Sequence, residues 1–425
     1  MPRVIGAILV LFSALAMVRP AASEQVEIAI SCGAVGVELQ LCSDAVRAWE
    51  QASGHRVRIV STPNSSTERL ALYQQVLAAG ASDIDVLQID VIWPGILAPH
   101  LVDLAPHVGG AAEQHFPNLI ENDRIGGKLL ALPWWTDAGV LYYRRDLLEK
   151  HGLAAPATWQ EMTEVARAVQ GAERAAGHRD LWGFVFQGRA YEGLTCNILE
   201  WVDSHGGGSF VADDGKVTID NAAARSALAL AASWIGDIAP RGVLNYDEEA
   251  ARGVFQSGNA VFMRNWPYAW ALAQGADSPV RGKVGVLALP RGTGENGKTS
   301  GTLGGWHLAV SRYSRHPKEA ASLVTFLTSP AQQKIRAIRG AYNPTIPALY
   351  EDAEVLAANP FFGQLFDSFQ NAVARPSSVT GVHYNRVSSA IWRAGHEILS
   401  GNAAADARLA ALAVELNRIG RRGRW

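Results

Sequence analysis

The alternation of apolar and polar residues predicts a strand–helix–strand order in the early part of the chain. This order is typical of parallel sheets, whose ligands gather beyond the carboxyl ends of the strands. Asp90 follows the third expected strand, so we expect it to face a ligand site. The expected strands are residues 26–31, 57–60 and 85–89, and the expected helices are residues 37–52 and 65–79.

The same mixture of patterns continues to the carboxyl end and places the chain in the α/β class. About 400 residues follow the first apolar run, more than one hydrophobic core usually supports, so two domains are expected. A capping box from Thr158 to Glu161 starts one of the later helices. Further strands are expected at residues 182–186, 260–263, 284–289 and 307–311, and helices at 191–205, 221–238 and over much of the chain after Pro317.

The stretch 132–144 combines two adjacent tryptophans with one carboxylate, Asp137. We expect a turn at its proline, then a strand at 139–143 and a helix at 144–151. Indole faces can cover the C–H side of a sugar, while the carboxylate accepts hydrogen bonds from sugar hydroxyls. The alternative is that the tryptophans belong to the core and that Asp137 caps a turn.

The composition favours a globular binding protein over the other classes. Forty-eight per cent apolar residues exclude a disordered chain, and the net charge of −2 gives no reason to expect nucleic acid or an anionic membrane as partner. The basic residues 418–425 are expected to be a solvated tail. The thirteen tryptophans include several beside Pro, Gly or Asp, which favours a binding cleft built from loops. These are Trp93, Trp134, Trp135, Trp266 and Trp306.

The first residues have the pattern of an export signal. Arg3 precedes an apolar run at residues 4–18, and small residues at 21–23 predict cleavage near Ser23. The alternative is a retained anchor, but the run is shorter than the ~20 residues that span a bilayer. We therefore expect residues 1–23 to be removed and the protein to be periplasmic.

Residues 292–299 match the phosphate-loop pattern letter for letter, but the glycine-rich residues 300–305 cannot form the helix that this loop needs. We expect an exposed loop there and no nucleotide. No other catalytic or metal-site signature occurs, so no cofactor and no metal are expected. Paired carboxylates among Asp90, Asp137 and Glu38 leave an exported glycoside hydrolase as the alternative function.

The export signal and the two α/β domains, together with four segments, resemble the carbohydrate solute-binding proteins of ABC transporters, most closely the trehalose/maltose-binding subgroup. The segments are residues 90–93, 132–144, 264–270 and 303–306. The resemblance implies two lobes that are joined by a hinge and close over a cleft. It places residues 24–136 plus 295–345 in the N-terminal lobe and residues 137–294 plus 346–425 in the C-terminal lobe.

The resemblance also implies a function without catalysis. A monomeric receptor would bind an α-linked disaccharide such as trehalose or maltose and present it to the membrane permease of an ABC importer. The residues to which it assigns sugar contact are Asp90, Asp137, Trp135, Trp266, Trp306 and Gly305, with Glu38, Arg69, Tyr268 and Arg375 in addition.

The three cysteines predict one disulfide. Export places the chain where thiols are usually oxidised. Cys32 lies at the end of a strand and Cys42 early in the next helix, and packing of that helix on its sheet can bring their Cα atoms within about 4.4–6.8 Å. Cys196 is then a buried thiol. The alternative is three reduced core cysteines.

Overall fold

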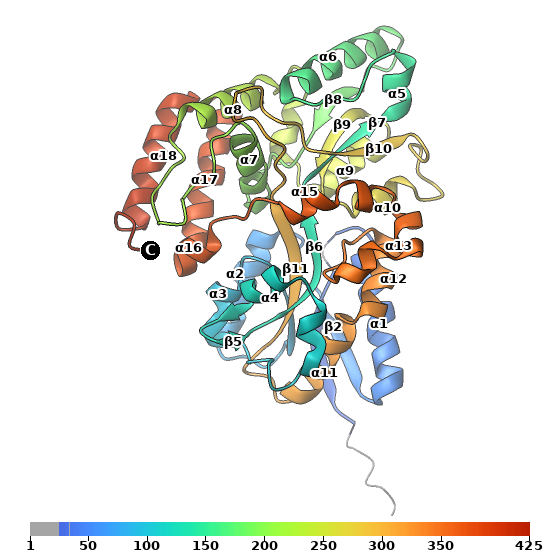
Figure 1. The fold of residues 1–425 in the computed structure, drawn as a ribbon, viewed down its shortest axis with the longest axis vertical. Helices are drawn as coiled ribbons and strands as arrows, with labels where there is room; N and C mark the ends of the chain where they lie inside the picture. The colour runs from blue at the N-terminus through green and yellow to red at the C-terminus, as the bar shows by residue number, and fades with distance from the viewer. Residues whose placement is uncertain (1–24, 34) are drawn as a thin grey trace, which may run out of the picture.

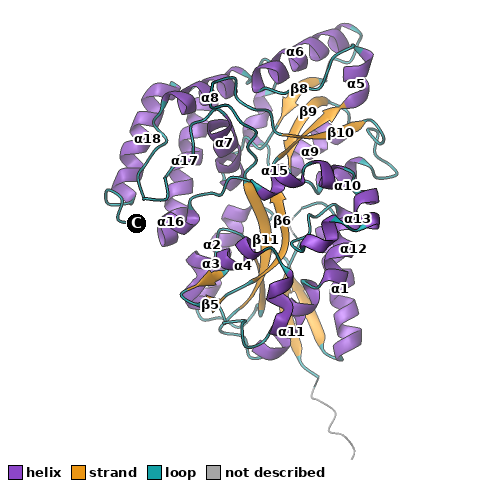
Figure 2. Ribbon diagram, viewed as in Figure 1, coloured by secondary structure: helices purple, strands orange, loops and turns teal. Residues whose placement is uncertain are grey.

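The computed structural model describes residues 25–33 and 35–425. The predicted signal peptide lies outside them. The described chain forms two bodies, each with its own sheet, and Figure 1 shows them one above the other. Helices surround both sheets (Figure 2).

The first lobe contains a five-stranded sheet in the order β2-β1-β3-β11-β6. Strand β1 is parallel to β2 and β3, as the strand–helix rhythm predicted, whereas β11 is antiparallel to both β3 and β6. The strands are β1 (Glu27–Ser31), β2 (Arg56–Val60), β3 (Val86–Asp90), β6 (Leu132–Ala138) and β11 (Leu303–Val310), with a separate hairpin of β4 (Arg124–Ile125) and β5 (Lys128–Leu129).

Helices from both ends of the chain surround this sheet (Figure 1). Those from the first third are α1 (Glu38–Ser53), α2 (Ser66–Ala78), α3 (Pro94–Leu97) and α4 (Pro117–Asn122), with 3-10 turns η1 (Ala98–His100) and η2 (Gly109–Gln114). Later in the chain, α11 (Pro317–Leu327) and α12 (Pro330–Gly340) return to the same lobe and contact α1.

The second lobe contains a four-stranded sheet in the order β10-β7-β9-β8. Its strands are β7 (Val140–Arg144), β8 (Trp182–Val185), β9 (Ala260–Asn265) and β10 (Val284–Ala288). Its helices are α5 (Arg145–Lys150), α6 (Trp159–Ala175), α7 (Glu192–Ser204), α8 (Ala222–Ser233), η3 (Arg241–Asn245), α9 (Glu248–Gln256), α10 (Ala269–Ala273), α17 (Tyr384–Leu399) and α18 (Ala405–Ile419).

Short helices connect α12 to α17 along the junction of the two lobes. They are η4 (Pro347–Tyr350), α13 (Ala353–Ala358), α14 (Phe361–Gln364), α15 (Phe366–Gln370), α16 (Ser377–Thr380) and η5 (Gly381–His383). The described chain thus passes between the two sheets at Gly139, at residues 289–302 and again after α15 (Figure 1).

Local signals explain where several helices begin and end. The Ser65 side chain accepts from the backbone N–H of Glu68 at the start of α2, and the predicted capping box of Thr158 and Glu161 starts α6. Helix α1 ends at Gly54, whose left-handed φ of 77° favours glycine.

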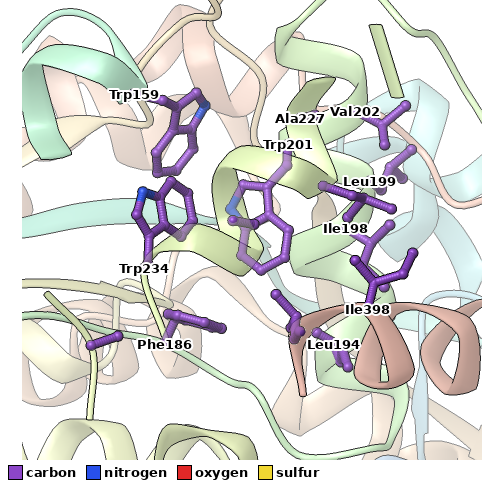
Figure 3. Close-up of a cluster of buried hydrophobic side chains, with 14 of the residues drawn as sticks. Trp159, Phe186, Leu194, Ile198, Leu199, Trp201, Val202, Ala227, Trp234 and Ile398 are labelled. Carbon is purple, nitrogen blue, oxygen red and sulfur yellow. The ribbon is translucent and has the colours of Figure 1, made fainter. Parts of the chain in front are cut away.

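Each lobe has its own apolar core. In the second lobe, the indoles of Trp159, Trp201 and Trp234 pack together beside α7 (Figure 3). In the first lobe, the core includes a disulfide between Cys32, which follows β1, and Cys42 of α1, whose Cα atoms are 6.5 Å apart. Cys196 is a buried free cysteine.

The structure corrects three of the predicted elements. The stretch that we expected to be a turn is strand β6, all of which is buried, and α5 is shorter than the predicted helix. Helix α8 ends at Ser233 rather than at residue 238. Residues 421–424 are exposed, as predicted for the tail, while the Trp425 indole N–H donates to the carbonyl of Gly215 at 2.9 Å.

Candidate ligand site between the lobes

A cavity lies between the two lobes and encloses about 620 Å³ of unfilled space, its opening included. Both lobes and the segments that connect them contribute side chains. The lining residues are Val35, Asn64, Ser66, Asp90, Trp135, Asp137, Glu192, Gly193, Cys196, Glu248, Trp266, Tyr268, Gly304, Gly305, Trp306, Tyr342 and Arg375.

The register of the first sheet brings the first-lobe residues together. Trp306 of β11 lies opposite Asp90 of β3 on one side and opposite Trp135 of β6 on the other. The ring centroids of Trp135 and Trp306 are 6.4 Å apart. Residues that are far apart in the sequence therefore form one row of aromatic and acidic side chains across neighbouring strands.

Gly305 allows β6 and β11 to approach closely at the cavity. Its φ is +128°, and a Cβ atom at this position would lie 2.6 Å from the carbonyl oxygen of Trp135. Both facts require glycine here. Gly305 therefore shapes the cavity wall through its backbone.

The second lobe contributes residues from the end of β9 and from the first turns of two helices. Trp266 and Tyr268 follow β9, while Glu192 and Glu248 are the first residues of α7 and α9. Glu248 accepts a hydrogen bond from the Tyr191 hydroxyl at 2.5 Å and one from the Trp266 indole at 3.4 Å. The indole of Trp266 is thereby held at the cavity wall.

Burial raises the pKa of two carboxyl groups in the cavity wall. It raises the pKa of Asp137 well above its usual range, although the Trp135 indole donates to Asp137 Oδ2 at 3.1 Å and opposes this shift. Burial also raises the pKa of Glu248 against the hydrogen bond from Tyr191. Both groups are therefore poised to exchange hydrogen bonds with neutral hydroxyls.

Arg375 connects the two lobes at the cavity. Its Nη2 donates to Asp90 Oδ1 of the first lobe at 2.8 Å, and its Nη1 donates to Glu192 Oε1 of the second lobe at 2.9 Å. Its Nε is buried and has no hydrogen-bond partner in the described chain. Asp90 raises the pKa of Arg375 well above its usual range despite burial, which lowers it. Arg375 therefore stays charged.

Eight of the ten predicted sugar-contact residues line this cavity, and two lie behind its wall. The Arg69 guanidinium lies 4.8 Å from the Trp306 ring centroid and donates to the carbonyls of Pro63 and Gly33. Glu38 is buried at the start of α1, with its Oε1 4.0 Å from Nη2 of Arg336. Direct sugar contact by Arg69 or Glu38 stays a prediction.

Two tryptophans that we predicted at a cleft belong to the core. Trp134 is 1% exposed and packs under the guanidinium of Arg336, whose Cζ lies 3.9 Å from its ring centroid. Trp93 is also 1% exposed and meets the edge of Trp306. A neighbouring Pro or Asp therefore does not indicate whether a tryptophan lies in the core or at the cleft.

Glu192, Glu248 and Tyr342 also line the cavity but were not predicted from the sequence. Glu192 and Glu248 lie in the first turn of their helices, where the helix dipole stabilises carboxylates. In the sequence they therefore resemble ordinary helix-start residues. No local signal distinguishes Tyr342, whose ring centroid lies 5.1 Å from that of Trp135.

The glycine-rich loop at residues 292–299 leads into β11 rather than into a helix, as predicted. Its Lys298 forms an ion pair with Asp203 at 3.0 Å. In the described part of the chain no group of three or more His, Cys, Asp or Glu residues could hold a metal ion.

Comparisons with known proteins agree with this architecture. Residues 40–334 match the family described as bacterial extracellular solute-binding protein. A Deinococcus radiodurans relative, described as a probable ABC transporter-binding protein, is 50% identical over 400 residues, which is 94% of each chain. The structure of maltose-bound T. maritima MalE3 is 41% identical, covers 93% of this chain and 100% of its own, and has a TM-score of 0.88.

More distant proteins are similar to this chain in sequence or in structure. The mannitol-binding protein of Pseudomonas aeruginosa is 24% identical over 343 residues, 75% of this chain and 77% of its own. The GacH receptor of Streptomyces glaucescens, solved unliganded and with acarbose, is 21% identical with a TM-score of 0.81 and covers 93% of this chain and 100% of its own. The predicted two-lobe α/β fold is confirmed, while the predicted lobe boundaries stay a prediction.

Proposed function

This chain belongs to the bacterial extracellular solute-binding protein family, and we propose that it binds an α-linked disaccharide, maltose or trehalose, by closing its lobes. It is a solute-binding receptor of an ABC sugar importer. The observation that carries the proposal is the row of Asp90, Trp306 and Trp135 at a cavity that Trp266 of the second lobe also lines.

The chemistry of the cavity suits a neutral sugar of two rings. Aromatic faces from both lobes can cover apolar ring surfaces, and carboxyl groups from both lobes can exchange hydrogen bonds with hydroxyls. A buried polar group that misses its hydroxyl costs roughly 1–3 kcal/mol, so two missed contacts reject a wrong sugar. The maltose-bound relative at 41% identity supports an α-linked ligand.

The glycoside hydrolase alternative has no support from the relatives, which are binding proteins. A receptor needs no reaction at Asp90 or Asp137. Their role in the proposal is to hold hydroxyls while the closed lobes exclude water.

We also propose that the receptor is a periplasmic monomer, cleaved near Ser23, that delivers its sugar to permease subunits. No helix in the described chain is long and apolar enough to cross a membrane. The family's extracellular location supports export.

The test is titration calorimetry of the purified protein with maltose, trehalose, sucrose, mannitol and glucose, followed by analysis of the recovered sugar. We expect maltose or trehalose to saturate one site per chain and to be recovered intact. Sustained release of glucose from either disaccharide would support the hydrolase instead. Tighter binding of mannitol or glucose than of both disaccharides would refute the proposed ligand class.

A further inference from the structure

A buried ion pair lies where the chain passes between the lobes. Glu200 of α7 and Arg264 of β9 are both fully buried, with Arg264 Nε 2.8 Å from Glu200 Oε2 and a second bond from Nη2 to Oε1. Gln187 Oε1 accepts from Arg264 Nη1 at 3.1 Å. The Glu200 carboxylate and the Arg264 guanidinium are therefore held by hydrogen bonds at the boundary of the second lobe.

The first passage of the chain lies directly against this pair. Gly139 is the single residue between β6 of the first sheet and β7 of the second. A Cβ atom on Gly139 would lie 2.1 Å from Glu200 Oε1 and 2.5 Å from Arg264 Nη2. The ion pair lies so close that only glycine, which has no Cβ atom, fits at position 139.

The second passage is bound by the same carboxylate. The backbone N–H of Thr302 donates to Glu200 Oε1 at 3.1 Å, and the Thr302 hydroxyl donates to the carbonyl of Cys196 at 2.9 Å. Gly301 lies so close to the first passage that a Cβ atom there would be 2.8 Å from the carbonyl oxygen of Gly139. The first two passages therefore meet at Glu200.

The third passage pairs with the second. The N–H of Leu303 donates to the carbonyl of Val373, and the N–H of Val373 donates to the carbonyl of Gly301, both at 2.8 Å. Val373 lies two residues before Arg375, which connects the lobes at the cavity. All three passages are thus linked to one ion pair.

The same pair is also continuous with the ligand cavity. The Arg264 guanidinium carbon lies 4.0 Å from the ring centroid of Trp266, which lines the cavity. Residues at spacings of four share one face of a helix, and on α7 these are Glu192 and Cys196, which line the cavity, and Glu200 at the passages. One helix face therefore reaches from the ligand site to the hinge.

We propose that Glu200 and Arg264 form a hinge anchor that fixes the three passages to the second lobe and transmits contact at Trp266 to lobe closure. Both partners belong to the second lobe, so the pivot lies on the first-lobe side of Gly139 and Thr302. Glu200 and Arg264 act as positioning residues and do not touch the sugar. The inference rests on the proposed function for its ligand.

The test compares Glu200→Gln with a matched control, Glu173→Gln. Glu173 is also fully buried in the second lobe and ion-paired, with Lys150 at 2.6 Å, but it belongs to α6 rather than to the passages. Both variants lose a buried charge, so both should melt earlier than wild type. Only Glu200→Gln should weaken maltose binding, by between about twofold and thirtyfold.

The second readout is amide hydrogen exchange of the ligand-free protein. Glu200→Gln should exchange faster at Thr302, Leu303 and Val373, whereas Glu173→Gln should match wild type there. If either the maltose affinity of Glu200→Gln or its exchange at these amides matches that of Glu173→Gln, the pair is merely structural and the proposal is overturned. If Glu200→Gln does not fold, Gly139→Ala, which crowds the pair, replaces it with the same expected and contradicting results.

The two proposals fail in different ways. If wild-type protein binds none of the tested sugars, the proposed ligand class is wrong, and exchange in the ligand-free variants still tests the anchor. If wild-type protein binds maltose but the passage amides of Glu200→Gln exchange as in wild type, only the anchor is wrong.

Discussion

Arg375 Nη2 donates to Asp90 Oδ1 at 2.8 Å, although the two residues are 285 positions apart in the chain. Asp90 ends β3 of the first lobe, while the other side of Arg375 is held by Glu192 of the second lobe. Arg375 therefore contacts both lobes at the same time. We therefore expect the two bonds of Arg375 to stabilise lobe closure as well as the ligand site.

We predict that Arg375→Ala weakens maltose binding by about 2 kcal/mol or more, because it leaves Asp90 and Glu192 buried without their cation. Titration calorimetry measures this loss. Arg393→Ala is the control, since Arg393 forms an exposed ion pair with Glu415 at 2.8 Å and should bind maltose as wild type does. Unchanged affinity in Arg375→Ala would show that the bridge plays no part in closure.

The raised pKa of Asp137 predicts a pH dependence of stability. The folded state holds a proton on Asp137 to a higher pH than the unfolded chain does, so wild-type stability falls as the pH rises from about 4 through the raised pKa. Asp137→Asn removes this contribution. Its unfolding free energy relative to wild type should therefore increase with pH, as measured by denaturant unfolding from pH 4 to 8. A constant difference would show that Asp137 titrates normally.

The lowered pKa of Glu173 predicts a stability contribution that rises with pH, opposite to that of Asp137. Burial raises the pKa of Glu173, but hydrogen bonds from Lys150, His151 and His178 outweigh burial and lower it to about 2. The stabilisation is present above about pH 4.5 and is lost as the pH falls toward 2. It should amount to about 2 kcal/mol, because the exposure of Lys150 and His178 reduces the full effect.

Acid unfolding of wild type and Glu173→Gln measures this contribution. The two proteins should differ in unfolding free energy at pH 6 and converge below pH 3. A difference that persists at low pH would mean that Glu173 acts through packing rather than through its charge.

Much of the fold was predictable because its signals are local. The Ser65 and Thr158 caps, the glycine that ends α1 and the carboxylate at the end of β3 are all signals that act within a few residues. Residues 132–138 were misread as a turn because β6 is buried along its whole length and shows no alternation, whereas the strand predicted at 139–143 is β7. Pro133 is tolerated because β6 is the edge strand of its sheet.

The candidate site was only partly predictable, because it depends on pairing between distant strands. The register of β3, β11 and β6 determines that Trp306 and Trp135 face the cavity while Trp134 enters the core. Sequence patterns do not contain this register. Glu192 and Glu248 were missed for a similar reason, since only the packing of α7 and α9 directs their first turns toward the cavity.

The disulfide between Cys32 and Cys42 predicts that unfolded, unreduced protein has one reactive thiol, that of Cys196. Native protein should have none, because Cys196 is buried and burial raises the pKa of its thiol. The bridge closes a loop of ten residues and should stabilise the first lobe by roughly 2–3 kcal/mol on the chain-entropy estimate. It also fixes the turn that leads to Glu38 at the start of α1, so reduction should weaken maltose binding together with stability. Thiol counting with a colorimetric reagent, with and without denaturant, decides the pairing: three thiols in the unfolded chain would show that the cysteines are reduced.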